Sequence, residues 1–395
     1  MPQSFPPVYI VSAARTPIGA YLGSLSALAA PRLGAIAIQG ALGRAKLGPE
    51  LIGEVFMGNV LSAGIGQAPA RQAMIYAGLP DTVPATTVGK VCGSGLQAVV
   101  LGAKTVALGD ADLVVAGGME SMSNVPYYLE KARTGYRMGD GKLVDGMIFD
   151  GLWDPYNNVH MGTCGDKCAA EYKFTREQQD EYAKESFRRA LAAQKEGLFD
   201  REIEPVSIPQ KKGDPLLVKL DEGPSKGDAS KFASLRPAFA KDGTVTAANA
   251  SPINDGASAL VLASEAAVKQ HKLEPLARIV GYASAAGAPE WFTTAPAKAI
   301  TNVTTKLGIT TDQIDLYEIN EAFAVVAMVC ARLTHIDLER VNVRGGAVAL
   351  GHPIGASGAR ILTTLVHTMK DQNKKRGLAT LCIGGGEALA VVVER

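Results

Sequence analysis

The sequence predicts an α/β fold made of two similar halves, and three observations support this prediction. Short apolar segments alternate with amphipathic segments and glycine-rich turns along most of the chain. The 395 residues are many for one hydrophobic core, which favours two domains or a duplicated unit. The order of the segments also recurs in the second half. We therefore expect layered, largely parallel sheets with helices on both faces.

The first half is expected to alternate strands and helices in a regular order. Leu47-Gly48-Pro49 ends the first helix, because glycine favours a helix C-terminus and proline cannot continue the helix. Gly117-Gly118 follows the last strand. The predicted strands are 9–12, 54–58, 85–91 and 113–116, and the predicted helices are 31–46, 69–77 and 92–108.

A long polar excursion then interrupts this order between Glu120 and Asp242, with one clear amphipathic helix at 176–195. An insertion of this length in a compact domain is more often functional, or in contact with another subunit, than a linker. A strand at 257–262 resumes the first half. The expected division is a first half of residues 1–119 and 243–272, an inserted loop domain of residues 120–242, and a second half of residues 273–395.

The second half repeats the first. The turns at 46–48 and 306–308 both read Lys-Leu-Gly, and 33 positions separate Asn59 from Cys92 while 32 separate Asn320 from His352. Cys92 and His352 therefore occupy equivalent places, and ligands of such sheets bind beyond the carboxyl ends of the strands, where both residues lie. The predicted strands here are 278–282, 315–319, 341–343, 378–383 and 388–393, and the helices are 296–307, 321–333 and 354–369.

Cys92 is a candidate nucleophile in the segment Val91-Cys92-Gly93-Ser94-Gly95. At the start of a helix, free N–H groups and the dipole favour a thiolate, and the N–H groups of the following residues could receive an oxyanion. The alternative is an unreactive core cysteine at a tight turn, which this segment alone favours. A histidine on the equivalent helix of the other half favours the nucleophile, because it supplies a general base for the thiol.

Three further positions have a chemical and a structural interpretation. His352, between Gly351 and Pro353, is either that general base or a helix cap. Cys382 ends a buried strand before three glycines, which either let backbone approach a ligand or only form a turn. Asn320 either holds a water or caps a helix.

Composition excludes several classes of protein. A net charge of +1 gives no general field for nucleic acid, and no apolar stretch approaches the ~20 residues that span a bilayer, so neither partner is expected. Five cysteines without framework spacing suggest a reducing compartment, and Cys164 with Cys168 is a poor metal site. Met1–Pro7 does not resemble a secretory signal, so we expect a cytoplasmic protein, with a mature mitochondrial form as the alternative.

Motifs along the whole chain resemble the signature segments of the thiolase family. The resemblance implies a duplicated α/β/α/β/α layered fold with an inserted loop domain, and a homotetramer built as a dimer of dimers. It also implies an acyltransferase that condenses two acetyl-CoA reversibly to acetoacetyl-CoA and CoA through an S-acetyl-cysteine. The matching segments are Val91–Gly95, His160–Gly162, Gly243–Ser251, Asn320–Phe323, Gly345–Pro353 and Cys382–Gly386.

The resemblance also assigns catalytic roles. Cys92 would take the acetyl group and His352 its proton, while Cys382 would remove the α-proton of the second acetyl-CoA. Asn320 would hold a water that, with His352, stabilises the enolate oxygen. The backbone N–H groups of Cys92 and Gly384 would bind the acyl carbonyl.

Substrate contacts follow from the same likeness. His160 and Met161 resemble the pair that packs on pantetheine and narrows the acyl pocket in short-chain members, which favours acetoacetyl-CoA. Lys226 and Lys231 match a loop near the CoA nucleotide, although each could equally be a solvated surface charge. Ser251 matches a pantetheine contact, Phe323 is placed among the CoA contacts, and Phe292 is placed at the acyl pocket.

No metal or cofactor is expected to be required. Some thiolases bind potassium near the positions of Ala247, Ala248, Ala250 and Val348 with the help of a tyrosine, but Phe187 stands at that position and lacks the hydroxyl. The chain also departs from many members at Gly93 and Glu387.

Two other functions compete with this reading. A β-ketoacyl synthase would generally place two histidines beside the cysteine. A thiolase-like acyl-CoA binding module would lack a catalytic residue.

Overall fold

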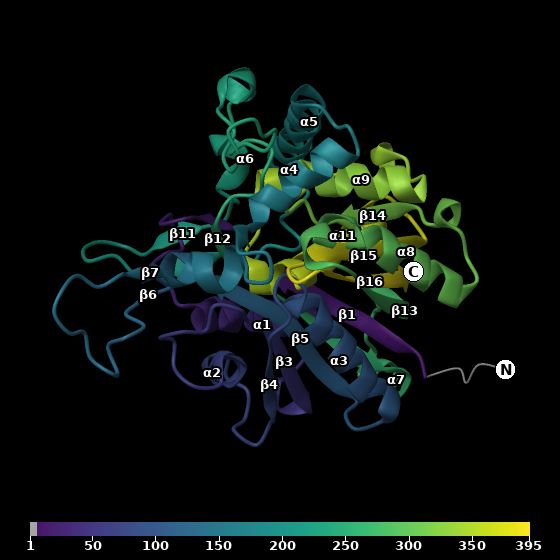
Figure 1. The fold of residues 1–395 in the computed structure, drawn as a ribbon. Helices are drawn as coiled ribbons and strands as arrows, with labels where there is room; N and C mark the ends of the chain where they lie inside the picture. Colours follow the sequence, from purple (N-terminus) through teal and green to yellow (C-terminus); the bar gives the residue numbers. More distant parts are fainter. Residues whose placement is uncertain (1–5) are drawn as a thin grey trace.

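Both halves of the chain contribute strands to the fold (Figure 1). The structure is a computed structural model that describes residues 6–395, so the first five residues of the predicted first half, most of the Met1–Pro7 segment, lie outside the described part. The first half holds β1 (Val8–Arg15), β2 (Gly19–Ala20), β3 (Glu54–Gly58), β4 (Ala85–Val88), β5 (Leu113–Ser121) and β12 (Asn254–Ser264). The second half holds β13 (Ala277–Ala286), β14 (Leu316–Ile319), β15 (Arg376–Ile383) and β16 (Glu387–Glu394).

These ten strands form one sheet in the order β14-β15-β16-β13-β1-β12-β5-β3-β4, with β2 paired to β12. The halves join where Val8–Ile10 pairs with Ala277–Ile279. The prediction of largely parallel sheets is wrong, because only β3/β4, β3/β5 and β14/β15 are parallel. The tight glycine turn between β15 and β16 allows only an antiparallel pair, and β12 returns from the excursion antiparallel to both of its long neighbours.

The helices match the sequence prediction closely, apart from their first turns. Helix α3 begins two residues after Cys92, and α9 begins after the Asn320–Phe323 segment instead of within it. The predicted strand 341–343 is only a single bridge between Val341 and Tyr317. The helices of the two halves are α1 (Ala30–Ala45), α2 (Pro69–Tyr76), α3 (Ser94–Leu108), α7 (Glu265–Gln270), α8 (Ala295–Leu307), α9 (Ala324–Thr334), α10 (Ala347–Leu350) and α11 (Ile354–Asp371).

Three apolar cores divide the fold into layers. The central core contains α3 and α11 together with strand residues of both halves, such as Leu260 and Leu381. One outer core covers the first half with α1 and α2, and the other covers the second half with α8 and α9. Figure 1 shows α3 beside the first-half strands and α8 and α9 beside the second-half strands.

Helices α3 and α11 approach each other closely at their first turns. A Cβ atom on Gly95 would lie 2.9 Å from the backbone nitrogen of Ala359, and one on Gly358 would overlap the backbone of Leu96. Only glycine permits this contact. The close approach brings together the ends of the two loops that carry Cys92 and His352.

The excursion of residues 120–242 contains helices and short paired strands. Its helix α5 begins where predicted, because Thr175 and Gln178 form a reciprocal capping box. Buried Arg15 of β1 anchors it through ion pairs with Glu202 at 2.6 Å and Asp221 at 2.7 Å. Its elements are β6 (Tyr127–Tyr128), β7 (Val144–Asp145), β8 (Trp153–Asp154), β9 (Val159–His160), α4 (Met161–Glu171), α5 (Arg176–Lys195), β10 (Val206–Ile208), β11 (Leu216–Val218) and α6 (Gly223–Lys226).

One helical stretch in residues 6–395, at 91–108, passes a length and hydropathy test for a membrane span. Of that stretch 61% is buried inside the protein. Because the helix packs in the central core, its hydropathy is explained by its place in the fold.

Candidate active site

Cys92 lies in a strained turn between β4 and α3. The residue before it, Val91, has a φ of 44°, which is unusual for a β-branched side chain and is a form of strain that clusters at functional sites. Ser94 holds the turn, since its hydroxyl accepts a bond from the Lys90 N–H at 2.8 Å and donates to the Val91 carbonyl at 2.7 Å. The sulfur is thereby fixed just before the helix begins.

The Cys92 thiol is protonated at rest. Burial raises its pKa to about 11, and the N–H groups of Gly384 and of Cys92 itself, which bond the sulfur, offset burial only in part. Burial therefore outweighs the expected stabilisation of a thiolate at the start of the helix. The N–H groups of Gly93 and Ser94 are not available to an oxyanion, because they bond the carbonyls of Lys90 and Val91.

His352 has the hydrogen bonds of a general base. The Ser357 hydroxyl donates to the Pro353 carbonyl at 2.9 Å, so its oxygen accepts the proton on His352 Nδ1, which lies 2.6 Å away. The Nε2 atom then carries the lone pair. Within residues 6–395 this buried Nε2 has no hydrogen-bond partner, so it is free to accept a proton.

Burial also keeps His352 neutral. It lowers the histidine pKa to about 3, with a smaller contribution from the positive charge of Arg360. The backbone N–H of His352 donates to Asn254 at 2.9 Å, which fixes the loop before α11. A neutral thiol and a neutral imidazole therefore make up the resting pair.

Asn320 lies beside His352 with spare hydrogen-bonding capacity. Its Nδ2 is 3.5 Å from His352 Nδ1, but both atoms carry protons in this tautomer and do not bond, and its buried Oδ1 has no partner in the part of the chain described. Ser251 fixes the same loop, because its hydroxyl donates to the Ala322 carbonyl at 2.9 Å. The Asn320 amide can therefore hold a water.

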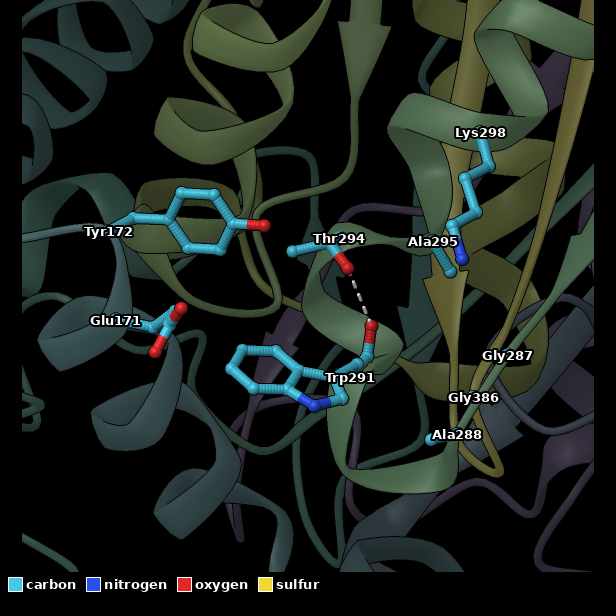
Figure 2. Close-up of a pocket in the computed structure, with 9 residues that line it drawn as sticks. All are labelled: Glu171, Tyr172, Gly287, Ala288, Trp291, Thr294, Ala295, Lys298 and Gly386. Atoms are coloured by element: carbon cyan, nitrogen blue, oxygen red, sulfur yellow. Dashed lines mark hydrogen bonds between the residues drawn. The ribbon is translucent and has the colours of Figure 1, made fainter.

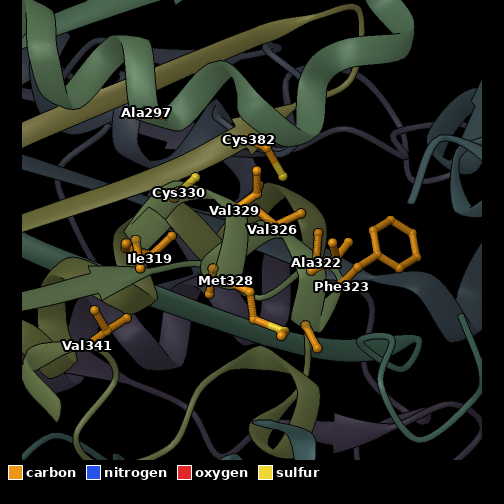
Figure 3. Close-up of a cluster of buried hydrophobic side chains, with 14 of the residues drawn as sticks. Ala297, Ile319, Ala322, Phe323, Val326, Met328, Val329, Cys330, Val341 and Cys382 are labelled. Carbon is orange, nitrogen blue, oxygen red and sulfur yellow. The ribbon is translucent and has the colours of Figure 1, made fainter. Parts of the chain in front are cut away.

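Cys382 is the last residue but one of β15 and lies in the second-half outer core, which also contains Val326 and Val329 (Figure 3). Burial raises the pKa of its thiol well above 9, and negative charge on Cys92 raises it further. Ionisation of one of these two thiols therefore disfavours ionisation of the other. Gly384 lies two residues after Cys382 and bonds the Cys92 sulfur, which brings the two cysteine loops together.

A row of aromatic rings lines the loop-domain side of the site. His160 stacks on Phe239 at 4.5 Å between ring centroids, and Phe239 meets Phe323 edge to face at 6.2 Å. His160 Nδ1 accepts the Gly162 N–H, and burial lowers its pKa, so neutral His160 has a donor on Nε2. Met161 lies 3.3 Å from where a Cβ on Gly384 would be.

The remaining predicted contacts lie in two places. Phe292 is 2% exposed and extends this row into the outer core, where its ring packs against Phe323. Lys226 and Lys231 lie on an exposed stretch of the excursion, where each pairs with a neighbouring carboxylate, Glu222 and Asp228 respectively. The structure therefore does not bring the two lysines to the reactive groups.

Two family models match the chain, which carries Cys92, His352 and Cys382 on loops from both halves of the fold. The thiolase N-terminal domain matches residues 8–266 and the thiolase C-terminal domain matches residues 273–395. The chain belongs to the thiolase family.

Relatives with known names agree with this assignment. The chain is 55% identical to acetyl-CoA acetyltransferase 2 of Arabidopsis thaliana, with 98% of this chain and 96% of the relative covered. It is 54% identical to the acetyl-CoA acetyltransferase of Cupriavidus necator, with 98% and 99% covered. The crystal structure of Acat5 thiolase from Ascaris suum in complex with coenzyme A has a TM-score of 0.94 and 44% identity, and the match covers 98% of this chain and 100% of that one.

Sequence reasoning missed Glu120 in this thiolase. Its buried carboxylate accepts hydrogen bonds from the Asn59 side chain at 2.8 Å and from the N–H groups of Val60, Leu61 and Gly355 at 3.1, 3.1 and 2.9 Å. Burial nevertheless raises its pKa to about 7. Glu120 thus connects the first half to the first turn of α11. The sequence around Glu120 could not predict this bond, because its donor lies 235 residues away.

Strand register explains where Glu120 lies. Gly58 pairs with Gly118 as Ile319 pairs with Thr380. Asn59 comes one residue after Gly58, and Asn320 comes one residue after Ile319. Glu120 comes two residues after Gly118, and Cys382 comes two residues after Thr380. Glu120 is therefore the first-half counterpart of Cys382.

The potassium position does not fit the ion well. The Phe187 ring packs edge to face on Phe232 at 5.5 Å and provides no oxygen ligand. The Val348 N–H donates to Glu321 at 3.1 Å. No group of three His, Cys, Asp or Glu residues that could hold a metal occurs in residues 6–395.

A surface pocket adjoins the outer side of the Cys382 loop (Figure 2). Its volume is about 400 Å³, and Tyr172, Trp291, Lys298 and Gly386 are among the residues that line it. Cys92, His352 and Cys382 are not among them. This pocket is therefore separate from the reactive groups.

Proposed function

We propose that this thiolase is an acetyl-CoA acetyltransferase, which condenses two acetyl-CoA to acetoacetyl-CoA and CoA through S-acetyl-Cys92. The observation that carries the proposal is the Gly384 N–H on the Cys92 sulfur, because it joins the nucleophile to the loop of the second cysteine. The relatives named above as acetyl-CoA acetyltransferases support the substrate.

The first half-reaction acetylates Cys92. His352 Nε2 takes the thiol proton as the sulfur attacks the acetyl carbonyl, and the oxyanion accepts bonds from the N–H groups of Cys92 and Gly384. The intermediate collapses and the carbon–sulfur bond to CoA breaks. The CoA thiolate leaves with the proton of Cys382, so a Cys382 thiolate and a protonated His352 remain.

Acetylation prevents Cys92 from ionising. Because a thioester carries no charge, no negative charge on Cys92 raises the pKa of Cys382 during this step. The Cys382 thiolate then removes the α-proton of the second acetyl-CoA. Protonated His352 and a water held by Asn320 stabilise the enolate, which attacks the acetyl carbon. Cys92 leaves as a thiolate and takes the proton back from His352, while Cys382 keeps the proton from the substrate.

The ring row favours short acyl chains. His160 stacks on Phe239, Phe323 stands edge to face with Phe239, and Met161 lies against Gly384, so this wall of side chains suits a small acyl group. The proposal places pantetheine on this wall and on Ser251, and the CoA nucleotide at Lys226 and Lys231. It needs no metal and no resident cofactor.

Intact-mass spectrometry after brief mixing with acetyl-CoA tests the mechanism. We expect an acetyl adduct on the unaltered protein and on Cys382→Ser but not on Cys92→Ala, and we expect both variants to lose cleavage of acetoacetyl-CoA by CoA. Cys164→Ala, at a buried cysteine of α4, is the control and should keep both activities. No adduct on the unaltered protein, with CoA still bound, would favour an acyl-CoA binding module.

A homotetramer and a cytoplasmic location complete the proposal. Exposed apolar residues gather in the excursion, and large patches of this kind mark interfaces. Strand β4 is an unpaired edge of the sheet, which suits pairing with a second copy. All five cysteines are free, which suits a reducing compartment, and a relative from Gibberella zeae is named as cytosolic. The exposed residues are Tyr127, Leu129, Tyr136, Met138, Leu143, Phe149 and Tyr156.

Light scattering on Met138→Asp tests the assembly. Met138 is 104% exposed, so the charge should not disturb folding but should shift the mass from a tetramer toward a dimer. Leu108→Asp, at another exposed apolar residue, is the matched control. An unchanged mass for Met138→Asp would remove the excursion from the interface.

A further inference from the structure

The two cysteine loops come from opposite halves and touch along their length. The Gly384 N–H bonds the Cys92 sulfur, and a Cβ on Gly384 would lie 3.2 Å from Val91. A Cβ on Gly93 would overlap the end of Ile383. A small slip between the loops would therefore move the N–H group away from the sulfur.

An ion pair crosses this junction. Lys90 Nζ pairs with Glu387 Oε2, and the two side chains are 25% and 38% exposed. Lys90 lies two residues before Cys92, and Glu387 lies three residues after Gly384. Each charge therefore sits on the backbone that carries one of the two groups in contact.

The two loops joined by this ion pair differ in how firmly their own contacts hold them. Residues 384–386 are all glycine, and Gly385 and Gly386 both have φ of 89°, so little besides neighbouring contacts restricts this loop. On the other side, Ser94 rigidly connects the Lys90 backbone to the strained Val91 turn. A fixed Lys90 can therefore hold the more flexible loop through Glu387.

We propose that Lys90 and Glu387 are a positioning pair, which holds the glycine loop over the nucleophile turn so that the Gly384 N–H stays on the Cys92 sulfur. Under the proposed function, the same contact aligns this N–H with the oxyanion of acetyl transfer. Neither side chain takes part in the chemistry.

Charge exchange tests the pair. Lys90→Met and Glu387→Gln should each slow acetylation of Cys92 about fivefold, the effect of losing a partly exposed ion pair. Lys90→Glu and Glu387→Lys should be slower still as single variants, while the double exchange should return to within about twofold of the unaltered rate. High salt should slow the unaltered protein but not the doubly neutral variant. Arg278→Met, which removes the pair at the other end of β16, is the control.

Two readouts separate this inference from the proposed function. Alkylation of Cys92 by iodoacetamide needs no acetyl-CoA, so its rate should fall in the single variants even if the protein had another substrate. Equal thermal unfolding temperatures exclude loss of the fold. Single variants that keep both rates, or a double exchange that does not recover, would overturn the inference. A Lys90 defect that appears only with acetyl-CoA would also overturn it, because it would assign Lys90 to CoA binding.

Discussion

Replacing Ser357 by alanine should disable the base without touching the nucleophile. The Ser357 oxygen accepts the proton on His352 Nδ1 at 2.6 Å, and this bond keeps the lone pair on Nε2. In Ser357→Ala the buried Nδ1–H loses its partner, which costs about 1–3 kcal/mol. The imidazole avoids that cost by moving its proton to Nε2, where it can no longer accept one from Cys92.

The size of the effect follows from that cost. Because about 1.4 kcal/mol corresponds to a factor of ten, acetylation of Cys92 at neutral pH should slow about five- to 150-fold. Rapid quenching followed by intact-mass measurement gives this rate directly. Thr368→Val is the matched control, since it removes a similar bond on α11, from Thr368 to the Thr364 carbonyl at 2.7 Å, far from His352.

The pH dependence identifies the cause. As the pH rises toward the Cys92 pKa of about 11, hydroxide takes over deprotonation of the thiol, so the Ser357→Ala deficit should shrink. A deficit of constant size at every pH would point to altered structure instead of a lost base. Acetylation by Ser357→Ala at the unaltered rate would refute the assignment of the tautomer.

Three other perturbations address packing and charge. Gly93→Ala places a methyl group against Ile383 and should lower the free energy of unfolding in urea by about 1 kcal/mol. Adding Ile383→Val should restore this stability, because the shorter side chain makes room for the methyl group. An equal loss of stability in the double variant would contradict the overlap. Because the pKa of His352 falls from 6.5 to about 3 on folding, its contribution to stability is complete above about pH 6.5 and is lost as the pH drops toward 3. Between pH 7 and pH 5 the free energy of unfolding should therefore fall by about 2 kcal/mol less in His352→Gln than in the unaltered protein. Equal falls in the two proteins would exclude this linkage. Arg15→Met leaves Glu202 and Asp221 buried without their partner and should lower the free energy of unfolding in urea by about 3–5 kcal/mol. A change below about 1 kcal/mol would show that the ion pairs do not anchor the excursion.

Local chemistry made most elements predictable. Strand β3 and helix α5 have the predicted bounds, because an apolar segment between polar turns and the capping box of Thr175 are complete signals in themselves. The matched spacing of Asn59 and Asn320 likewise placed Cys92 and His352 on equivalent helix starts. The division into domains and the roles of the site residues stay predictions that the experiments above address.

Contacts between distant segments were not predictable. Strand β5 continues through Gly117 and Gly118 although glycine usually ends a strand, because the backbones of Ser258 and Ala356 approach too closely for a side chain. Phe239 is a lone aromatic residue in a polar stretch, so its stacking on His160 could not be predicted. The donors that bond the Glu120 carboxylate likewise lie on two other segments of the chain. The raised pKa of Cys92 was not predictable for the same reason, since burial depends on the whole fold.

The equivalence of the two halves has a consequence for how the site can work. Asn59 and Asn320, Cys92 and His352, and Glu120 and Cys382 are three pairs at equivalent positions of the two halves. A thioester has no such symmetry, so a symmetric cleft could not tell its acyl end from its CoA end. Under the proposed function the reaction gains a direction because the members of two of these pairs differ: the nucleophile Cys92 corresponds to the base His352, and the carboxylate Glu120 corresponds to the proton carrier Cys382. The proposed reaction therefore needs residues of both halves, and the two related halves have different tasks in it.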